Sequence, residues 1–300
     1  MKLATIKDGS RDGQLAVVSR DLKSAHMADA ICPTLQAALD DWAFIAPQLD
    51  SLYTQLNAGQ ARRAFDFDPA RCMAPLPRAF QWAVGAACVN HEAPASSRGE
   101  PLMYQGAGDN LLGPMDDIVL AHEEWGIDFE AGVAVIVDDV PMGATPDEAH
   151  GRIRLLMLVN DVSLRKLIPA ELDKGFGFLQ SKPATSFSPL AVTPDELGEA
   201  WRGGKVQLPL RSIWNGHLVG QPDAGVDMAF NFPQLIAHLC RSRKVRAGSI
   251  VGSGAASNQA AADGGPCAPF MRFGDTIRIE MQDEKGKSVF GAIEQAVRKA

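Results

Sequence analysis

Two carboxylates lead directly into an apolar run of this sequence. Asp128 and Glu130 come just before Val133–Ile136. Residues two apart in a strand point to the same face, so Asp128, Glu130 and Gly132 would share one side of a strand here. Carboxylates beside a buried strand are costly unless they are neutralised, and Mg²⁺ or Ca²⁺ would neutralise them through oxygen ligands. The plainer interpretation is that both acids lie at the solvated end of the strand.

Two further segments carry groups that suit the same chemistry. Asp161 follows the apolar run Leu155–Asn160, where it would add a carboxylate ligand, and Arg165 comes after it as a contact for an anion. Lys182 lies among glycines and apolar residues, between two phenylalanines. Because a lysine in apolar surroundings is normally paired, we expect Lys182 at a site for an anion or a carbonyl group.

Other catalytic motifs are absent from the sequence. No G-x-S-x-G, H-E-x-x-H, P-loop or EF-hand pattern occurs, and Gly252-Ser253-Gly254 alone is typical of a turn. Gly106-Ala107-Gly108 is not followed by a third glycine, so it does not make a dinucleotide fingerprint. The sequence therefore gives no sign of a serine hydrolase or of a Rossmann enzyme.

The composition is that of an ordinary globular protein. The 300 residues are 46% apolar and 22% charged, which excludes a disordered or fibrous chain. The apolar runs are too short to cross a membrane, and the charged N-terminus does not resemble a signal peptide. Five scattered cysteines predict a reducing, cytoplasmic location. A net charge of −7 argues against sequence-independent binding to nucleic acids.

The first part of the chain alternates strand and helix signals. Lys2–Lys7 and Gln14–Ser19 predict a hairpin across a glycine-containing turn. Apolar residues three or four apart predict a helix from Leu35 to Leu56, in which Pro47 should cause a kink or a split. Residues 60–78 are rich in Arg, Asp and Pro and predict a connector. We therefore expect a small N-terminal α/β domain at residues 1–75 and a larger domain at residues 76–300.

From about residue 80 the sequence predicts a strand-rich mixed fold. Short apolar runs alternate with Gly, Pro and Asp turns. Helices are expected at Thr145–Arg154, after a threonine cap, and at Asn231–Arg241. The fold class is thus α+β and mostly β. The predicted strands are Ile118–Leu120, Asp128–Val137, Leu155–Asn160, Val206–Trp214, Ile250–Gly254 and Thr276–Met281.

Five segments, taken in order, resemble the fumarylacetoacetate hydrolase family over roughly residues 75–300. The family's acidic strand motif is matched by Asp128–Ala131, and its Asn-Asp-x-Ser-x-Arg motif by Asn160–Arg165. Its lysine motif is matched by Gln180–Pro189, which contains Lys182, its glycine-serine-glycine motif by Gly252–Gly254 and its closing strand by Phe273–Glu280. The opening residues also resemble the small N-terminal domain of bacterial members.

The resemblance implies a fold and a chemistry. The fold has mixed β-sheets rolled around a central pocket, and members are typically homodimers. The chemistry is hydrolysis of a carbon–carbon bond in a β-diketo acid, such as an acylpyruvate or a fumarylacetoacetate-like compound. A divalent cation, Mg²⁺ or else Mn²⁺ or Ca²⁺, would hold the enolate, and a histidine–carboxylate pair would activate water.

The same resemblance gives roles to single residues. Glu130 and Asp161 would bind the metal ion. His91 would take a proton from water and Glu92 would orient it, while Lys182 would stabilise the developing oxyanion. The substrate contacts would be Tyr104, Arg165, Gly254 and Ala255.

Four features of the sequence depart from the family pattern. Gly132 stands where the acidic motif has a second glutamate, which removes a metal ligand. Cys88 replaces a tyrosine, Ala255 replaces a threonine, and the segment Glu92–Glu100 is shorter than the family's lid. Two alternatives to hydrolysis therefore stay open. One is a repurposed isomerase, decarboxylase or cyclase with little or no metal dependence, and the other is a catalytically reduced homologue that binds a ligand.

Overall fold

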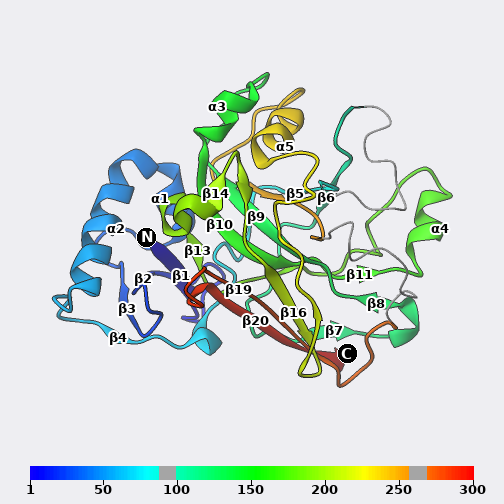
Figure 1. The fold of residues 1–300 in the computed structure, drawn as a ribbon, viewed down its shortest axis with the longest axis horizontal. Coiled ribbons are helices and arrows are strands. Elements are labelled where there is room, and N and C mark those ends of the chain that lie inside the picture. Colours follow the sequence, from blue (N-terminus) through cyan, green and yellow to red (C-terminus); the bar gives the residue numbers. More distant parts are fainter. Residues whose placement is uncertain (88–98, 257–268) are drawn as a thin grey trace.

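The structure is a computed structural model that describes residues 1–87, 99–256 and 269–300. Within these residues two β-sheets dominate, one of 11 strands and one of five, with short helices around them (Figure 1). The predicted fold class, α+β and mostly β with mixed sheets, is confirmed. No helix in the described part of the chain is long and apolar enough to cross a membrane.

The larger sheet begins with the N-terminal strands and continues into the rest of the chain. Its strands are β1 (Lys2–Ile6), β2 (Gln14–Val18), β3 (Ser24–Met27), β4 (Phe65–Asp66), β5 (Trp82–Gly85), β6 (Met103–Gly106), β9 (Ala131–Val137), β10 (Ile153–Asn160), β12 (Ser186–Phe187), β13 (Ala191–Val192) and β18 (Ile250–Gly252). Their order is β4-β3-β2-β1-β13-β10-β9-β18-β5-β6, with β12 beside β10, so the sheet does not close into a barrel. Because Lys2 pairs with Val192, the sheet crosses the expected boundary near residue 75. The division into domains stays a prediction.

The five-stranded sheet packs on one face of the larger sheet. Its strands, in spatial order, are β17 (His217–Gly220), β16 (Leu210–Trp214), β19 (Thr276–Gln282), β20 (Ser288–Lys299) and β7 (Ile118–Leu120). Alternate residues of β10 point to the two faces of the larger sheet. Leu156 belongs to the same buried cluster as Ile279 and Phe290 of the five-stranded sheet, while Leu155 belongs to the cluster on the helical side. Both faces of β10 are therefore buried, which explains its nearly continuous apolar sequence.

Two helices cover the other face of the N-terminal strands. They are α1 (Leu35–Asp40) and α2 (Trp42–Asn57). The predicted hairpin is confirmed, because β1 and β2 pair along their length. The predicted split at Pro47 is wrong, because the helix divides at Asp41, whose φ is −137°, and α2 continues through Pro47. A kink at Pro47 stays a prediction. The buried face of α2, including Leu49, keeps the helix in place despite the one N–H that proline lacks.

Several predicted elements are shorter than expected. Asp128–Val137 is two strands, β8 (Ile127–Asp128) and β9, because the N–H of Glu130 binds Asn160 Oδ1 at 3.1 Å and not a strand partner. Pro209 likewise separates β15 (Lys205–Val206) from β16. The remaining elements are α3 (Pro146–His150), α4 (Ile168–Leu172), α5 (Phe232–Leu239), β11 (Ser163–Leu164), β14 (Trp201–Arg202) and the 3₁₀ helices Pro69–Arg71, Glu123–Trp125 and Pro194–Ala200.

Candidate active site

Three charged side chains meet at the end of the two central strands. Lys182 Nζ lies 3.1 Å from Glu130 Oε2, 3.0 Å from Asp161 Oδ2 and 2.8 Å from the carbonyl oxygen of Asp161. The side chains of Lys182, Glu130 and Asp161 are 7%, 11% and 2% exposed. Charges this deeply buried have to be paired, and here Lys182 pairs with both carboxylates. The structure thus brings Lys182 together with both predicted metal ligands.

The strand register explains why the two acids are neighbours. Strands β9 and β10 are antiparallel, and Ala131 lies opposite Asn160. The residues just beyond this pair are Glu130 and Asp161, and the N–H of Asp161 donates to the carbonyl oxygen of Glu130 at 3.0 Å. Lys182 arrives from the loop between α4 and β12. The pairing of β9 with β10 therefore places Glu130 beside Asp161, although the two residues are far apart in the sequence.

Asp161 accepts hydrogen bonds at both of its carboxylate oxygens. Thr185 Oγ1 donates to Oδ1 at 2.9 Å, and the hydroxyl of Tyr104 donates to Oδ2, the oxygen that Lys182 also contacts. Burial, together with the charge of Asp161, raises the pKa of Tyr104 far above its ordinary value, so the phenol keeps its proton. Tyr104, predicted as a substrate contact, is therefore a proton-bearing group beside the carboxylate.

The other carboxylate is held by groups on and beside β11. Ser163 Oγ donates to Glu130 Oε1 at 2.6 Å. Arg165 reaches the same oxygen at 3.0 Å through one guanidinium nitrogen and Asp128 Oδ2 at 2.8 Å through Nε. Burial raises the pKa of Asp128, although hydrogen bonding and charge from Arg165 act in the opposite direction. Arg165, the predicted anion contact, thus bridges two acids of the acidic motif.

Glu171, on α4, holds the loop that carries Lys182, and the sequence analysis missed it. Its carboxylate accepts a 2.5 Å hydrogen bond from Ser181 Oγ. The Ser181 hydroxyl and the neighbouring backbone N–H groups hold the pKa of Glu171 below its ordinary value. Lys182 therefore enters the site from a loop that the half-buried Glu171 holds. The Glu171 carboxylate also accepts from the backbone N–H groups of Phe178, Leu179, Gln180 and Ser181, at 3.1, 3.1, 2.7 and 3.2 Å.

Gln295 is a second functional neighbour that sequence reasoning missed. Its Oε1 accepts from Asn160 Nδ2 at 3.0 Å and from Ser186 Oγ at 2.6 Å. Asn160 in turn binds the N–H of Glu130. The sequence contains a signal for Gln295, because it lies between Ile293 and Val297 on the buried face of β20 and is the polar residue among the three. A buried amide on an apolar strand face normally has hydrogen-bond partners.

The other side of the site lies around Gly132, next to the Gly254 backbone and Ser253. A Cβ added to Gly132 would lie 2.5 Å from the carbonyl oxygen of Gly254 and 3.3 Å from Ser253 Oγ. Gly254 itself has a φ of +76°, which ends β18 two residues before the predicted end of that strand. Among the described residues no hydrogen bond joins Gly254 or Ala255 to Lys182. The backbone of Gly254 therefore occupies the space in which a side chain at position 132 would start.

The predicted water-activating pair cannot be placed. His91 and Glu92, like Cys88, lie outside the described residues. Their roles stay predictions.

Comparison with known families covers nearly the whole chain. Residues 1–78 match the family model described as fumarylacetoacetase N-terminal domain 2, and residues 78–298 match the one described as fumarylacetoacetate (FAA) hydrolase C-terminal. The chain belongs to the fumarylacetoacetate hydrolase family. The resemblance seen in the five sequence segments is confirmed, and members of this family are enzymes.

Two curated relatives of this family member have different reaction types. A 2,4-didehydro-3-deoxy-L-rhamnonate hydrolase from Sphingomonas sp. (strain SKA58) is 26% identical over 186 residues, which is 61% of this chain and 62% of the relative. The oxaloacetate tautomerase YisK from Bacillus subtilis (strain 168) is 29% identical over 166 residues, 54% of this chain and 52% of the relative. The matches thus span less than two thirds of each relative.

A solved structure shares the fold over the whole chain. Maleylpyruvate hydrolase from Sphingobium sp. SYK-6, in complex with manganese(II) and pyruvate, superposes with a TM-score of 0.72 and covers 100% of both chains at 16% identity. Identity this low supports the shared fold of the family and no more.

The described residues of this family member do not fit a divalent cation. They contain no group of three His, Cys, Asp or Glu side chains placed to hold a metal ion. Each carboxylate oxygen of Glu130 and Asp161 already accepts from a donor within the protein. Lys182 supplies positive charge to both acids, and Arg165 supplies it to Glu130. A hard cation favours several anionic oxygens that are open to it. Here the positive charges of Lys182 and Arg165 stand beside these oxygens instead.

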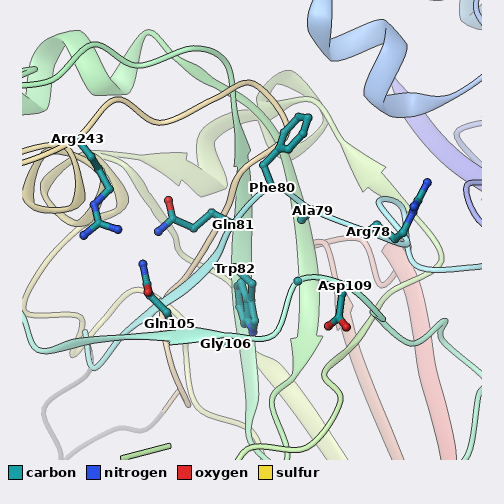
Figure 2. Close-up of a pocket in the computed structure, with 10 residues that line it drawn as sticks. Arg78, Ala79, Phe80, Gln81, Trp82, Gln105, Gly106, Asp109 and Arg243 are labelled. Atoms are coloured by element: carbon teal, nitrogen blue, oxygen red, sulfur yellow. The ribbon is translucent and has the colours of Figure 1, made fainter. Parts of the chain in front are cut away.

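An open pocket of about 570 Å³ lies beside Trp82 and not at Lys182 (Figure 2). The side chains of Arg243, Gln81 and Gln105 point toward one another along it (Figure 2). None of the predicted site residues lines this pocket. The pocket is linked to the site through Trp82, whose Nε1 donates to Thr185 Oγ1 at 3.2 Å.

Proposed function

We propose that this family member catalyses keto–enol tautomerisation of a small 2-oxo acid. The observation that carries the proposal is the shared contact at Asp161 Oδ2, where the Lys182 ammonium group and the Tyr104 hydroxyl meet. A carboxylate base, a fixed positive charge and a neutral proton donor are the groups that an enolisation requires. The similarity to an oxaloacetate tautomerase supports this reaction type.

The proposed steps use residues of this chain alone. Asp161 takes the proton from the enol hydroxyl while Lys182 stabilises the enolate oxygen. Tyr104 donates its proton to the neighbouring carbon and receives the proton held by Asp161 through their hydrogen bond. The raised pKa of Tyr104 disfavours a free phenolate, and Asp161 is in hydrogen-bond contact to return the proton. Both residues return to their starting states, and the substrate has changed from enol to keto form.

The test is the decay of enol oxaloacetate, followed by its ultraviolet absorbance. The wild type should accelerate the decay over buffer. Tyr104→Phe should lower kcat by about 10²–10⁴-fold, as for loss of a general acid. A wild-type rate equal to that of buffer would refute the proposal.

Hydrolysis of a carbon–carbon bond is the second candidate. The similarity to a 2,4-didehydro-3-deoxy-L-rhamnonate hydrolase favours it, and Lys182 would stabilise the enolate leaving group in the same way. This reaction also needs an activated water, for which His91 with Glu92 is the proposed pair. Release of pyruvate from an acylpyruvate, lost in His91→Ala, would establish it.

The remaining sequence-based expectations stay proposals. Mg²⁺ at Glu130 and Asp161 was expected from the sequence, but the described residues do not fit a divalent cation and no step of the proposed tautomerisation depends on one. Arg165 would bind a carboxylate of the substrate, and Gly254 and Ala255 would face its remainder. A homodimer and a cytoplasmic location follow from the family and from the cysteine pattern. Each has a direct measurement: calorimetry with the metal ion, light scattering and cell fractionation.

A further inference from the structure

Thr185 is held between a donor and an acceptor that fix the direction of its hydroxyl group. The indole Nε1 of Trp82 lies 3.2 Å from Thr185 Oγ1, and Thr185 Oγ1 lies 2.9 Å from Asp161 Oδ1. An indole N–H can only donate, so Thr185 must accept from Trp82. Its own proton is then directed to Asp161. The chain of hydrogen bonds has a single direction, from Trp82 to Asp161.

The indole is itself held firmly. Trp82 is 1% exposed, and its ring meets that of Phe187 edge-on, with 5.3 Å between centroids. A Cβ at Gly106 or at Gly252 would collide with the ring. The two glycines, one on each strand beside β5, therefore leave a slot that Trp82 fills. This slot aims Nε1 at Thr185.

We infer that Trp82 and Thr185 are positioning residues that select which oxygen of Asp161 acts in catalysis. With Oδ1 occupied by Thr185, the carboxylate presents Oδ2 to Lys182 and Tyr104. Without the Thr185 hydroxyl the carboxylate loses the bond that sets its rotation, and Oδ2 leaves the place where Tyr104 and Lys182 meet. This inference rests on the proposed tautomerisation for its kinetic effect, while the hydrogen bonds themselves do not.

The kinetic test compares variants at Thr185. Thr185→Val keeps the shape and removes the hydroxyl, and it should lower kcat roughly 10–100-fold with little change in KM, because a bond to a charged group is lost. Thr185→Ser keeps the hydroxyl and should restore most of kcat. Trp82→Phe removes the first donor together with part of the indole ring and should reduce kcat by a smaller factor. Equal kcat values for the valine and serine variants would overturn the inference.

A matched control separates position from general loss of a buried hydroxyl. Ser188 is fully buried and donates to the carbonyl oxygen of Leu190 at 2.9 Å, without contact to Asp161. Ser188→Ala should leave kcat unchanged even where it lowers the melting temperature. A fall in kcat equal to that of Thr185→Val would show that destabilisation, and not position, explains the effect.

A spectroscopic measurement tests the chain without any activity. The indole N–H resonance of Trp82, assigned by its loss in Trp82→Phe, should shift and exchange faster with solvent in Thr185→Val and keep its wild-type values in Thr185→Ser. An unchanged resonance in Thr185→Val would refute the hydrogen-bond chain. An inactive wild type that nevertheless shows the expected shift would reject the proposed function while leaving the chain of hydrogen bonds in place.

Discussion

The two sides of the candidate site are built in opposite ways. Around Asp161, every carboxylate oxygen has a donor from the chain, and Lys182 balances the charge. Gly132 itself has no side chain, and the carbonyl oxygen of Gly254 would lie 2.5 Å from a Cβ at this position. The polar side therefore needs no cation from outside to be stable, and the glycine side has no room for another acid. The acids of the family's motif are here paired with Arg165 and Lys182 of the same chain.

This contrast changes what a glutamate at position 132 would mean. The first atom of any side chain would fall 2.5 Å from the carbonyl oxygen of Gly254. Backbone must move before a carboxylate can enter the site. Gly132→Glu is thus a remodelling of the loop after β18 and not a simple return to the family pattern.

The largest effect should come from breaking the polar side. Lys182→Met leaves Glu130 and Asp161 as neighbouring buried anions, so we expect a loss of about 3–5 kcal/mol in the free energy of unfolding and a fall in kcat of roughly 10²–10³-fold. Urea denaturation and the enol decay assay measure the two effects. Lys174→Met, on the exposed part of the same loop, is the control and should match the wild type. A stable and active Lys182→Met protein would contradict this description of the site.

A smaller effect should come from filling the glycine side. Gly132→Ala should lower the free energy of unfolding by about 1–3 kcal/mol, because the added methyl group overpacks against Gly254. Gly220→Ala is a matched control, since the nearest atom to its Cβ would be 3.9 Å away. Equal stability of the two variants in urea would show that the loop after β18 moves without an energetic cost, which would contradict the expected overpacking.

These two sides also show what could be predicted from the sequence. The residues Glu130, Asp161 and Lys182 were found from acids and a lysine beside apolar runs, and sheet register then brought them together. The occupation of their oxygens was not predictable, because Thr185 and Tyr104 come from segments whose distance to Asp161 depends on tertiary structure. The crowding at Gly132 depends on the path of Gly254, which a one-dimensional pattern does not contain.

The fold shows the same limits. The hairpin of β1 and β2, the capped start of α3 and the presence of α5 follow from local signals and are confirmed. The ends of elements were less predictable, because long-range pairing decides them. The helix predicted at Thr145–Arg154 ends by Gly151, since Ile153 already pairs with Val137 in the sheet.

The smallest effect concerns the loop that carries Lys182. The pKa of Glu171 lies below its ordinary value of 4.5 because of the Ser181 hydroxyl and backbone N–H groups. A lowered pKa gives stability that is present above the unfolded-state value and is lost as the pH falls through the folded-state value. The wild type should therefore lose melting temperature below about pH 4.5 more steeply than Glu171→Gln. Glu199→Gln, an exposed acid elsewhere, should follow the wild type, and parallel curves for all three proteins would contradict the role of Glu171.

The central claim is that charge from Lys182, and not a divalent cation, supports enol chemistry at Asp161. The most direct measurement is the decay of enol oxaloacetate with wild-type protein treated with EDTA, repeated after addition of Mg²⁺ or Mn²⁺ and corrected for the rate without protein. We predict that the EDTA-treated protein is active and that either metal ion changes kcat by less than about twofold, since both carboxylates are already neutralised. Activity that disappears with EDTA and returns with the metal ion would contradict the claim.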